Sequence, residues 1–287
     1  MAGAVLAAAL LLCVLAAVGS GDDDRGIAGG SRGTATGGRT LAKLRPRVPS
    51  PPLATTAGDR RAVEQVLSYT GAVSKGGDAR RDVALTFDDG PGPDTGRILA
   101  TLRRLRAPAT FFAMGRSIST AAGTDALRRL GGPDYPIGDH TMFHPPLGRL
   151  GAAAQDQEIA GQAALLRRHG KGRPVMFRPP YGSFNATTIQ ILRREGMLMV
   201  LWTVDTKDFS SPGTKQIVYA AVSGARPGAI ILMHDGPGER EQTLAALPRI
   251  VRRLREGGYR LVTVPKMLRE NPPPRGQPPP QPLSGGF

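Results

Sequence analysis

The sequence predicts an α/β fold, a distorted (β/α) barrel of about seven parallel strands. Three observations predict it. Short apolar runs alternate with segments of helical periodicity through residues 78–270. Polar clusters follow several of these runs, as they do at the carboxyl ends of barrel strands, where active sites form. No stretch repeats at a fixed period, which argues against a solenoid.

Seven short apolar runs are the expected strands, and each is too short for a typical helix. The runs are residues 83–87, 109–113, 135–138, 175–178, 198–204, 229–233 and 260–264. Because helical segments separate them, the strands are expected to pair in parallel, with the helices packed around the sheet.

Helical periodicity is clearest in two of the intervening segments, where apolar residues recur three or four positions apart. These residues are Ile98, Leu99, Leu102 and Leu105 in the first segment, and Leu244, Leu247, Val251 and Leu254 in the second. A third helix is expected to begin after Asn185, a good N-cap, and to end at Gly196, which permits a left-handed cap.

The two ends of the chain differ in composition from the middle. Residues 1–20 carry no charge and contain an apolar run over 4–18 followed by small residues, which is typical of an export signal. An uncleaved membrane anchor through residues 4–18 is the alternative, although a span needs roughly 20 residues. Residues 21–77 are rich in Gly, Arg and Pro and residues 271–287 in Pro, so both are expected to be flexible. The compact domain is therefore predicted over residues 78–270.

Charge and cysteine content restrict the class of protein further. The only cysteine, Cys13, lies in the export signal, so neither disulfides nor thiol chemistry are expected in the mature chain. The formal net charge is +15, and the excess of basic residues favours anionic partners. Much of that charge sits in Arg–Arg pairs at predicted helix ends, with no interleaved aromatic residues, so no nucleic-acid partner is expected.

Polar residues gather at the ends of five predicted strands. They are Asp88–Asp89–Gly90, His140 with His144, residues 178–182, Asp205 with Asp208, and His234–Asp235. Three of the four histidines belong to these clusters. The fourth, His169, follows two arginines at a predicted helix end and is interpreted as a solvated cap. Strand ends of one sheet meet at one face, so these clusters predict a single active site.

These clusters resemble the motifs of the polysaccharide deacetylase family, which shares the NodB homology domain. The similar segments are residues 86–91 (Thr-Phe-Asp-Asp-Gly-Pro), 140–145 (His-Thr-Met-Phe-His-Pro), 178–182 (Arg-Pro-Pro-Tyr-Gly), 205–209 (Asp-Thr-Lys-Asp-Phe) and 232–234 (Leu-Met-His). A linking segment, residues 109–112 (Ala-Thr-Phe-Phe), is also similar to the family. The resemblance spans about residues 80–265 with all five motifs in order, and it implies a NodB-like barrel.

The residue types of the first two motifs suit a metal site. His140 and His144 are four positions apart, so one helical turn ending at Pro145 would place both on one face. Two imidazoles and one carboxylate with open positions suit Zn²⁺ acting as a Lewis acid. We therefore expect Asp89, His140 and His144 to bind a divalent metal, with Zn²⁺ as the expected ion.

Amide hydrolysis requires further groups, and the remaining motif residues suit them. Asp88 is the candidate general base, and His234 is the candidate acid for the leaving amine. Asp208 would orient His234 and raise its pKa, and Arg178 would hold Asp88 ionised. The resemblance implies that the backbone N–H of Tyr181 helps to bind the oxyanion. Adjacent side chains at a strand end diverge, so Asp88 and Asp89 are expected to face different partners.

For several of these residues a purely structural role is the alternative to a catalytic or binding role. Residues 178–180 could form only a rigid turn, Asp205 could only shape its loop, and Asp235 is interpreted as a structural turn residue. Phe209 and Trp202 are candidates either for the core or for a sugar-binding groove. Two positions depart from the family pattern, because Asp139 stands where Asn is frequent and Phe209 where Trp is usual. The second departure puts the sugar-stacking surface in question.

The expected function is hydrolysis of acetamide groups on N-acetylated sugars of a polysaccharide, either peptidoglycan or a chitin-like polymer, with release of acetate. The expected location is the extracellular space or the cell envelope. One alternative is an esterase that removes O-acetyl groups from a polymer such as xylan. A second alternative is a carbohydrate-binding pseudoenzyme without activity.

Overall fold

The computed structural model describes residues 53–276. The expected export signal and the anchor at residues 4–18 lie outside the described residues, as do the start of the 21–77 segment and the end of the Pro-rich tail. Within residues 53–276, no helix has both the length and the apolar character needed to cross a membrane.

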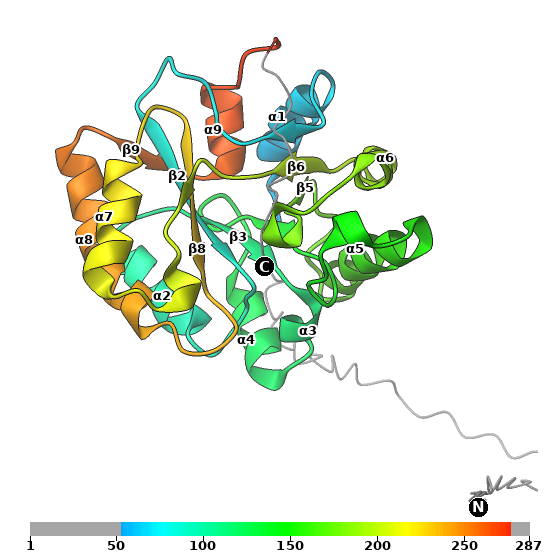
Figure 1. The fold of residues 1–287 in the computed structure, drawn as a ribbon, viewed down its shortest axis with the longest axis horizontal. Helices are drawn as coiled ribbons and strands as arrows, with labels where there is room; N and C mark the ends of the chain where they lie inside the picture. Colours follow the sequence, from blue (N-terminus) through cyan, green and yellow to red (C-terminus); the bar gives the residue numbers. More distant parts are fainter. Residues whose placement is uncertain (1–52, 277–287) are drawn as a thin grey trace, which may run out of the picture. The chain divides into compact units, whose positions relative to one another are not determined.

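The centre of the fold is one curved sheet whose strands all pair in parallel (Figure 1). Its order is β1-β6-β5-β4-β3-β2-β8-β7, and β9 pairs with β2 off this path. The strands are β1 (Ala72–Val73), β2 (Asp82–Asp88), β3 (Thr110–Ala113), β4 (Ile137–Asp139), β5 (Met176–Phe177), β6 (Leu198–Val200), β7 (Val204–Asp205), β8 (Ala229–His234) and β9 (Arg260–Val262). This order confirms the predicted α/β class with a distorted barrel.

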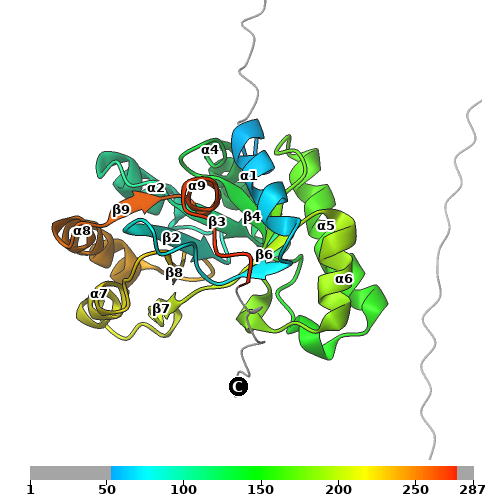
Figure 2. The same cartoon turned by 90° about the horizontal axis from the view of Figure 1, so that it is seen from above.

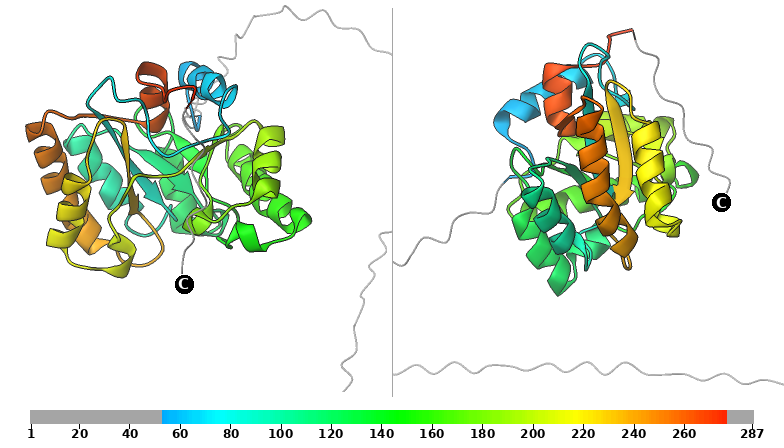
Figure 3. Two further views of the ribbon diagram at one scale, coloured as in Figure 1. Left: turned by 45° about the horizontal axis from the view of Figure 1, so that its top comes forward. Right: turned by 90° about the vertical axis from the view of Figure 1, so that its left-hand side faces the viewer.

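Helices cover the sheet in groups (Figures 1 and 2). Helices α7 and α8 pack against each other, α2 packs against α8, and α5 packs against α6 (Figure 3). Helices α1 and α9 form another pair. The bounds are α1 (Ala57–Leu67), α2 (Thr95–Arg104), α3 (Gly115–Ile118), α4 (Ala121–Arg129), α5 (Ala152–Arg168), α6 (Ala186–Glu195), α7 (Thr214–Ser223), α8 (Glu241–Glu256) and α9 (Val264–Glu270), with short 3-10 turns η1 (Leu147–Arg149), η2 (Pro180–Gly182) and η3 (Asp208–Ser210).

The predicted strands are present, but the run at residues 198–204 is not one strand. It forms β6 and β7, which lie near opposite ends of the sheet order. Between them the Leu201 N–H donates to the Val73 carbonyl at 2.7 Å, and the Thr203 N–H donates to the Ile230 carbonyl at 3.0 Å. The backbone groups of this run therefore change partners from the β1 side to the β8 side. The sequence shows only a continuous apolar run here, so it could not predict this change of hydrogen-bond partners.

The ordered fold begins before residue 78, where the sequence predicts the domain to start. Helix α1 is capped by Thr56, whose hydroxyl oxygen accepts a hydrogen bond from the Asp59 N–H. Its buried face includes Val63 and Val66, which pack in the same core cluster as Met267 of α9. Strand β1 adds to the sheet beside β6. The prediction that residues 21–77 are flexible is therefore wrong for the part that forms α1 and β1.

Strand β2 shows how the core positions the site. All seven of its residues are buried, as expected of a central parallel strand covered on both faces. Val83, Leu85 and Phe87 belong to the cluster that includes α2 and α8, whereas Ala84 belongs to the cluster that includes α1 and α9. Because side chains alternate along a strand, Thr86 and Asp88 are on the Ala84 side. The strand thus delivers one carboxylate into the interior of the fold.

Helix α6 has the ends that the sequence predicts. Asn185 accepts from the Thr188 N–H at 3.2 Å, and the Thr188 hydroxyl accepts from the Asn185 N–H at 3.1 Å, which completes a capping box. Gly196 closes the helix at a φ of 64°, a left-handed conformation that glycine adopts without the strain of a Cβ.

Candidate active site and metal centre

The sheet brings the motif residues to one end. Asp88 ends β2 and is the register partner of His234, which ends β8. His140 directly follows β4 and Arg178 directly follows β5, and the Arg178 N–H donates to the Asp139 carbonyl at 2.9 Å. Asp208 begins η3 shortly after β7. The predicted gathering of polar residues at the carboxyl strand ends is what the structure shows.

Asp88 and Asp89 face different partners. Asp88 is the last residue of the strand, and its carboxylate accepts from Arg178 at 2.7 Å. Asp89 has a φ of 72°, a left-handed conformation that turns its side chain toward His140 and His144. The strand-end alternation that we expected is therefore reinforced by a backbone turn, which separates the two carboxylates.

Arg178 is fully buried, and each of its three guanidinium nitrogens donates at least one hydrogen bond. Nη1 donates to Asp88 Oδ1 at 2.7 Å and to the Thr86 hydroxyl at 2.8 Å. Nε donates to the Val200 carbonyl at 2.9 Å and Nη2 to the Leu201 carbonyl at 3.2 Å. Residues 178–180 are therefore more than a rigid turn, because the arginine fixes the position of Asp88.

The loop that carries His140 and His144 is not the expected helical turn. Residues 140–146 contain no helix, and Thr141 and His144 have left-handed φ values of 67° and 65°. The Thr141 hydroxyl accepts from the His144 N–H at 3.0 Å, which holds the loop in this shape. The imidazole rings nevertheless come together, with centroids 5.0 Å apart. A tight loop, rather than a helix face, therefore pairs the histidines.

Asp89, His140 and His144 have the donor arrangement of a metal site. Their ligand atoms all lie within 4.8 Å of one another. Nε2 of His140 is 3.3 Å and Nε2 of His144 is 3.0 Å from Asp89 Oδ1, which is buried and has no hydrogen-bond partner among the described residues. His140 Nδ1 bonds to the Arg178 carbonyl at 2.7 Å, which leaves its Nε2 lone pair for a cation. These residues fit a divalent metal with two nitrogen ligands and one oxygen ligand.

Electrostatics favour the ionised form of Asp89. Burial would raise its pKa, but the two facing imidazoles outweigh burial and hold the pKa of Asp89 well below its usual range. Burial likewise opposes protonation of His140, yet the negative charges of Asp88 and Asp89 raise its pKa. A concentrated negative potential is what a metal cation would neutralise.

His234 is oriented by Asp208, as the sequence predicts. The Nδ1 of His234 lies 2.7 Å from Asp208 Oδ1, and the His234 N–H donates to Asp208 Oδ2 at 2.9 Å. Burial would lower the pKa of His234, but the hydrogen bond and charge of Asp208 prevail and raise it to about 9. With Nδ1–H donating to the carboxylate, Nε2 is the nitrogen available to a substrate.

Two aromatic residues lie beside the cluster. The Tyr181 ring is 4.6 Å from the His144 ring, and the Phe209 ring is 5.4 Å from the His234 ring. Their exposed fractions are 42% and 50%, so Phe209 is a rim residue rather than a core residue. Phe143, between the two metal-site histidines in sequence, is 65% exposed. The sequence did not predict the exposure of Phe143, because a single apolar residue in a loop does not indicate whether its side chain is buried or exposed.

Asp205 and Asp235 have structural contacts. Asp205 accepts from the Lys207 N–H at 2.8 Å and pairs with its ammonium at 3.0 Å, which shapes the loop before η3. Asp235 is buried, accepts from the Thr95 hydroxyl, and donates its own N–H to the Asp88 carbonyl at 3.0 Å. Burial raises the pKa of Asp235 to about 7, and the nearby Asp89 and Asp88 charges add to this.

Two threonines support the site in ways that the sequence did not predict; Thr86 belongs to the first motif but had no expected role, and Thr243 lies outside every motif. Thr86 accepts from Arg178 and donates to the Ile231 carbonyl at 2.8 Å. Thr243, on α8, donates to Asp208 Oδ2 at 2.7 Å. Thr243 is 35 residues from its partner. Only the packing of α8 beside the end of β8 brings it there, so no local pattern could have predicted it.

Replacing Arg178 by methionine is expected to lower the free energy of unfolding by about 3–5 kcal/mol, because it leaves the buried Asp88 carboxylate unpaired. Urea unfolding checks this. Arg173→Met, which removes a partly exposed pair with Glu195, is the control and should cost about 1 kcal/mol or less. Adding Asp88→Asn to Arg178→Met should recover part of the loss. An Arg178→Met protein as stable as the control would contradict this role.

The fold and the site define an α/β protein with an Asp-His-His cluster that could hold a metal ion, flanked by an Asp–Arg pair and a His–Asp pair. The "Polysaccharide deacetylase" family model matches residues 75–200. A chitooligosaccharide deacetylase of Rhizobium leguminosarum bv. trifolii is 36% identical over 65% of this chain and 91% of its own. A peptidoglycan-N-acetylglucosamine deacetylase of Bacillus cereus is 35% identical over 65% and 88%. The chain belongs to the polysaccharide deacetylase family.

A solved structure agrees with this assignment. The crystal structure of a peptidoglycan N-acetylglucosamine deacetylase is 29% identical to this chain and superposes with a TM-score of 0.66. The match covers 73% of this chain and 98% of that one. The α/β fold of this chain is therefore shared with an experimentally determined relative.

Proposed function

We propose that this chain is a metal-dependent hydrolase that removes acetyl groups from N-acetylated sugars of a polysaccharide and releases acetate. The observation that carries the proposal is the fully buried Arg178–Asp88 pair directly beside the Asp89–His140–His144 cluster. Asp88 Oδ2 is 3.8 Å from Nε2 of His140, while Asp88 Oδ1 is held by the arginine. This arrangement aims one carboxylate oxygen at the cluster, where a proton acceptor is required.

Each group has a step in the proposed reaction. A divalent cation at Asp89, His140 and His144 would supply Lewis-acid chemistry, polarising the acetamide carbonyl and acidifying water. Asp88 accepts the proton of the attacking water, and Arg178 keeps that carboxylate oriented. His234 then donates a proton to the leaving amine, and Asp208 holds its ring in place. The backbone N–H of Tyr181 is proposed to stabilise the developing oxyanion.

The proposed substrate is a polymer of N-acetylglucosamine, either peptidoglycan or a chitin-like chain. The names of the two relatives support both choices. The exposed rings of Tyr181 and Phe209 beside the histidines offer apolar faces against which a sugar can pack. An O-acetyl esterase acting on a polymer such as xylan would use the same groups, and it is the second candidate. The two candidates differ in the bond that they cleave. A deacetylase of the proposed kind releases acetate from N-acetyl groups, whereas the esterase releases it from O-acetyl groups.

We propose that the protein acts outside the cytoplasm, in secreted form or in the cell envelope. The apolar run at residues 4–18 followed by small residues supports export. A peptidoglycan substrate would also require access to the cell wall.

The substrate assay should use the chain from residue 53 at the latest, because cutting at 78 would remove α1 and β1 from the fold. The enzyme is incubated with peptidoglycan, chitin oligomers and acetylated xylan, and released acetate is measured. Acetate from one of the two N-acetylglucosamine polymers is the expected result. Acetate from xylan alone would replace the proposal by the esterase, and none from any polymer would favour a sugar-binding pseudoenzyme.

Chelation is expected to abolish activity, and added Zn²⁺ is expected to restore it, because the proposed reaction depends on the cation. His140→Ala and His144→Ala should each bind metal poorly. Metal content by mass spectrometry is measured beside activity, with His169→Ala as a control that removes a histidine at the end of α5. Full activity in a metal-free sample would refute the metal assignment.

A further inference from the structure

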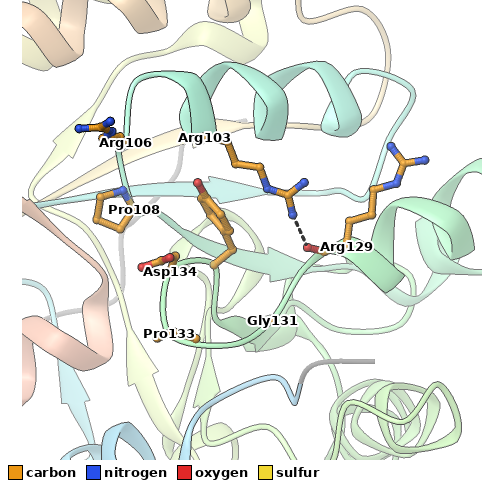
Figure 4. Close-up of a pocket in the computed structure, with 8 residues that line it drawn as sticks. Arg103, Arg106, Pro108, Arg129, Gly131, Pro133 and Asp134 are labelled. Atoms are coloured by element: carbon orange, nitrogen blue, oxygen red, sulfur yellow. Dashed lines mark hydrogen bonds between the residues drawn. The ribbon is translucent and has the colours of Figure 1, made fainter. Parts of the chain in front are cut away.

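A polar hollow lies at the end of the strands opposite the metal-site residues. It has a volume of about 480 Å³ and is formed where α2 leads into β3 and where α4 leads into β4 (Figure 4). These are the amino ends of the two strands, whereas the metal-site residues follow their carboxyl ends. The residues that line it are Arg103, Arg106, Pro108, Arg129, Gly131, Pro133, Asp134 and Tyr135. We name this hollow the arginine pocket.

The arginine pocket carries excess positive charge. Arg103 and Arg106 have no carboxylate partner among the described residues, whereas Arg129 pairs with Asp125 at 2.7 Å. Asp134 is the one acidic residue in the lining. A further guanidinium lies at the edge, because Arg255 donates to the Arg106 carbonyl at 2.9 Å. Two of the lining arginines therefore carry a positive charge that no carboxylate of the described residues neutralises.

The pocket also has a defined shape. Arg103 donates to the Arg129 carbonyl at 3.1 Å and lies over the Tyr135 ring at 5.6 Å, so its side chain is held in place. Figure 4 shows the side chain of Arg103 below α2, with Arg106 on one side of it and Arg129 on the other. Pro108 and Pro133 contribute apolar walls. The guanidinium groups are spread along the pocket and do not converge on one point.

Guanidinium groups bind phosphate oxygens in bidentate fashion, with geometric specificity as well as charge. A row of such groups matches an anion that repeats along a chain better than a single small ion, since each added contact is intramolecular. We propose that the arginine pocket is an accessory binding site for the phosphodiester groups of a polyol-phosphate or sugar-phosphate polymer. The polymer would be held at the end of the sheet opposite the metal-site residues.

The test measures binding of a soluble glycerol-phosphate oligomer by calorimetry. Inorganic phosphate is the comparison, because it offers a single phosphate group. The variant Arg103→Gln/Arg106→Gln removes the two unpaired charges. Arg106 has a φ of 49°, and glutamine meets the same backbone strain there, so the fold should be kept. The control is Arg167→Gln/Arg168→Gln. These arginines lie in the last turn of α5, have no ion pair among the described residues, and do not line the pocket.

The dissociation constant for the oligomer should rise about tenfold or more in the pocket variant and about twofold or less in the control. Inorganic phosphate should bind more weakly than the oligomer. Equal weakening in both variants would show attraction by net charge alone and would overturn the proposal. It would also be overturned if the oligomer did not bind, or if only vesicles of anionic phospholipid bound in a way that depended on Arg103 and Arg106.

Activity on a short neutral chitin oligomer separates this proposal from the proposed function. The pocket variant should retain the activity of the parent protein, because its changes lie away from the metal-site residues. Should the parent protein lack deacetylase activity, the binding comparison would still decide the role of the pocket.

Discussion

Asp88→Asn is expected to lower kcat by about 10²–10⁴-fold while leaving the metal content nearly unchanged. Asparagine keeps the shape of the side chain and can still accept from Arg178, but it cannot take up the proton of water. The Asp88 carboxylate contacts Arg178 at 2.7 Å and lies 3.8 Å from the nearest histidine nitrogen. Its loss should therefore affect the chemical step more than cation retention. Kinetics and metal analysis on the same preparation check this.

Asp89→Asn should have the opposite pattern. The substitution removes the only anionic ligand of the group formed with His140 and His144, so the cation should be lost and excess Zn²⁺ should partly restore activity. Asp205→Asn is the matched control, since that carboxylate contacts only its own loop in the described structure. If Asp88→Asn lost metal and Asp89→Asn retained it, the two assignments would be reversed.

His234→Ala is expected to lower kcat by a similar factor of about 10²–10⁴ and to remove the alkaline limb of the pH–rate profile. The proposed acid works in its protonated form, which is present below its pKa. Activity should therefore fall as pH rises toward the raised pKa of His234, about 9. A bound cation would repel the imidazolium, so the limb of the metal-bound enzyme should lie below that value.

Asp208→Asn tests the cause of that limb. The carboxylate of Asp208 is what raises the pKa of His234 against the effect of burial. Without it, burial should dominate and the alkaline limb should move to lower pH, while metal content stays the same. Thr243→Val removes one hydrogen bond to Asp208 but leaves its carboxylate in place, so it should move the limb much less than Asp208→Asn does. Full activity of His234→Ala with an unchanged limb would require a different proton donor.

The amino-acid sequence by itself determined the fold class, because apolar alternation and helical periodicity are local. Six of the seven expected strands appear as single strands, and the cap residues of α6 act as predicted. It also predicted which polar residues gather at one end of the sheet, since each motif directly follows or ends its strand. Parallel strands place Asp88 and His234 at the same end of the sheet, but the two are neighbours only because β2 pairs with β8.

The tertiary structure alone decided how those residues are held. The histidine loop owes its shape to left-handed residues that no periodicity reveals. Arg178 reaches Asp88 across 90 residues of sequence, and Thr243 reaches Asp208 across 35. The 198–204 run splits because its backbone groups pair with opposite sides of the sheet. Such partners depend on where distant segments pack, and a local pattern specifies which face of an element is buried but not what lies against it.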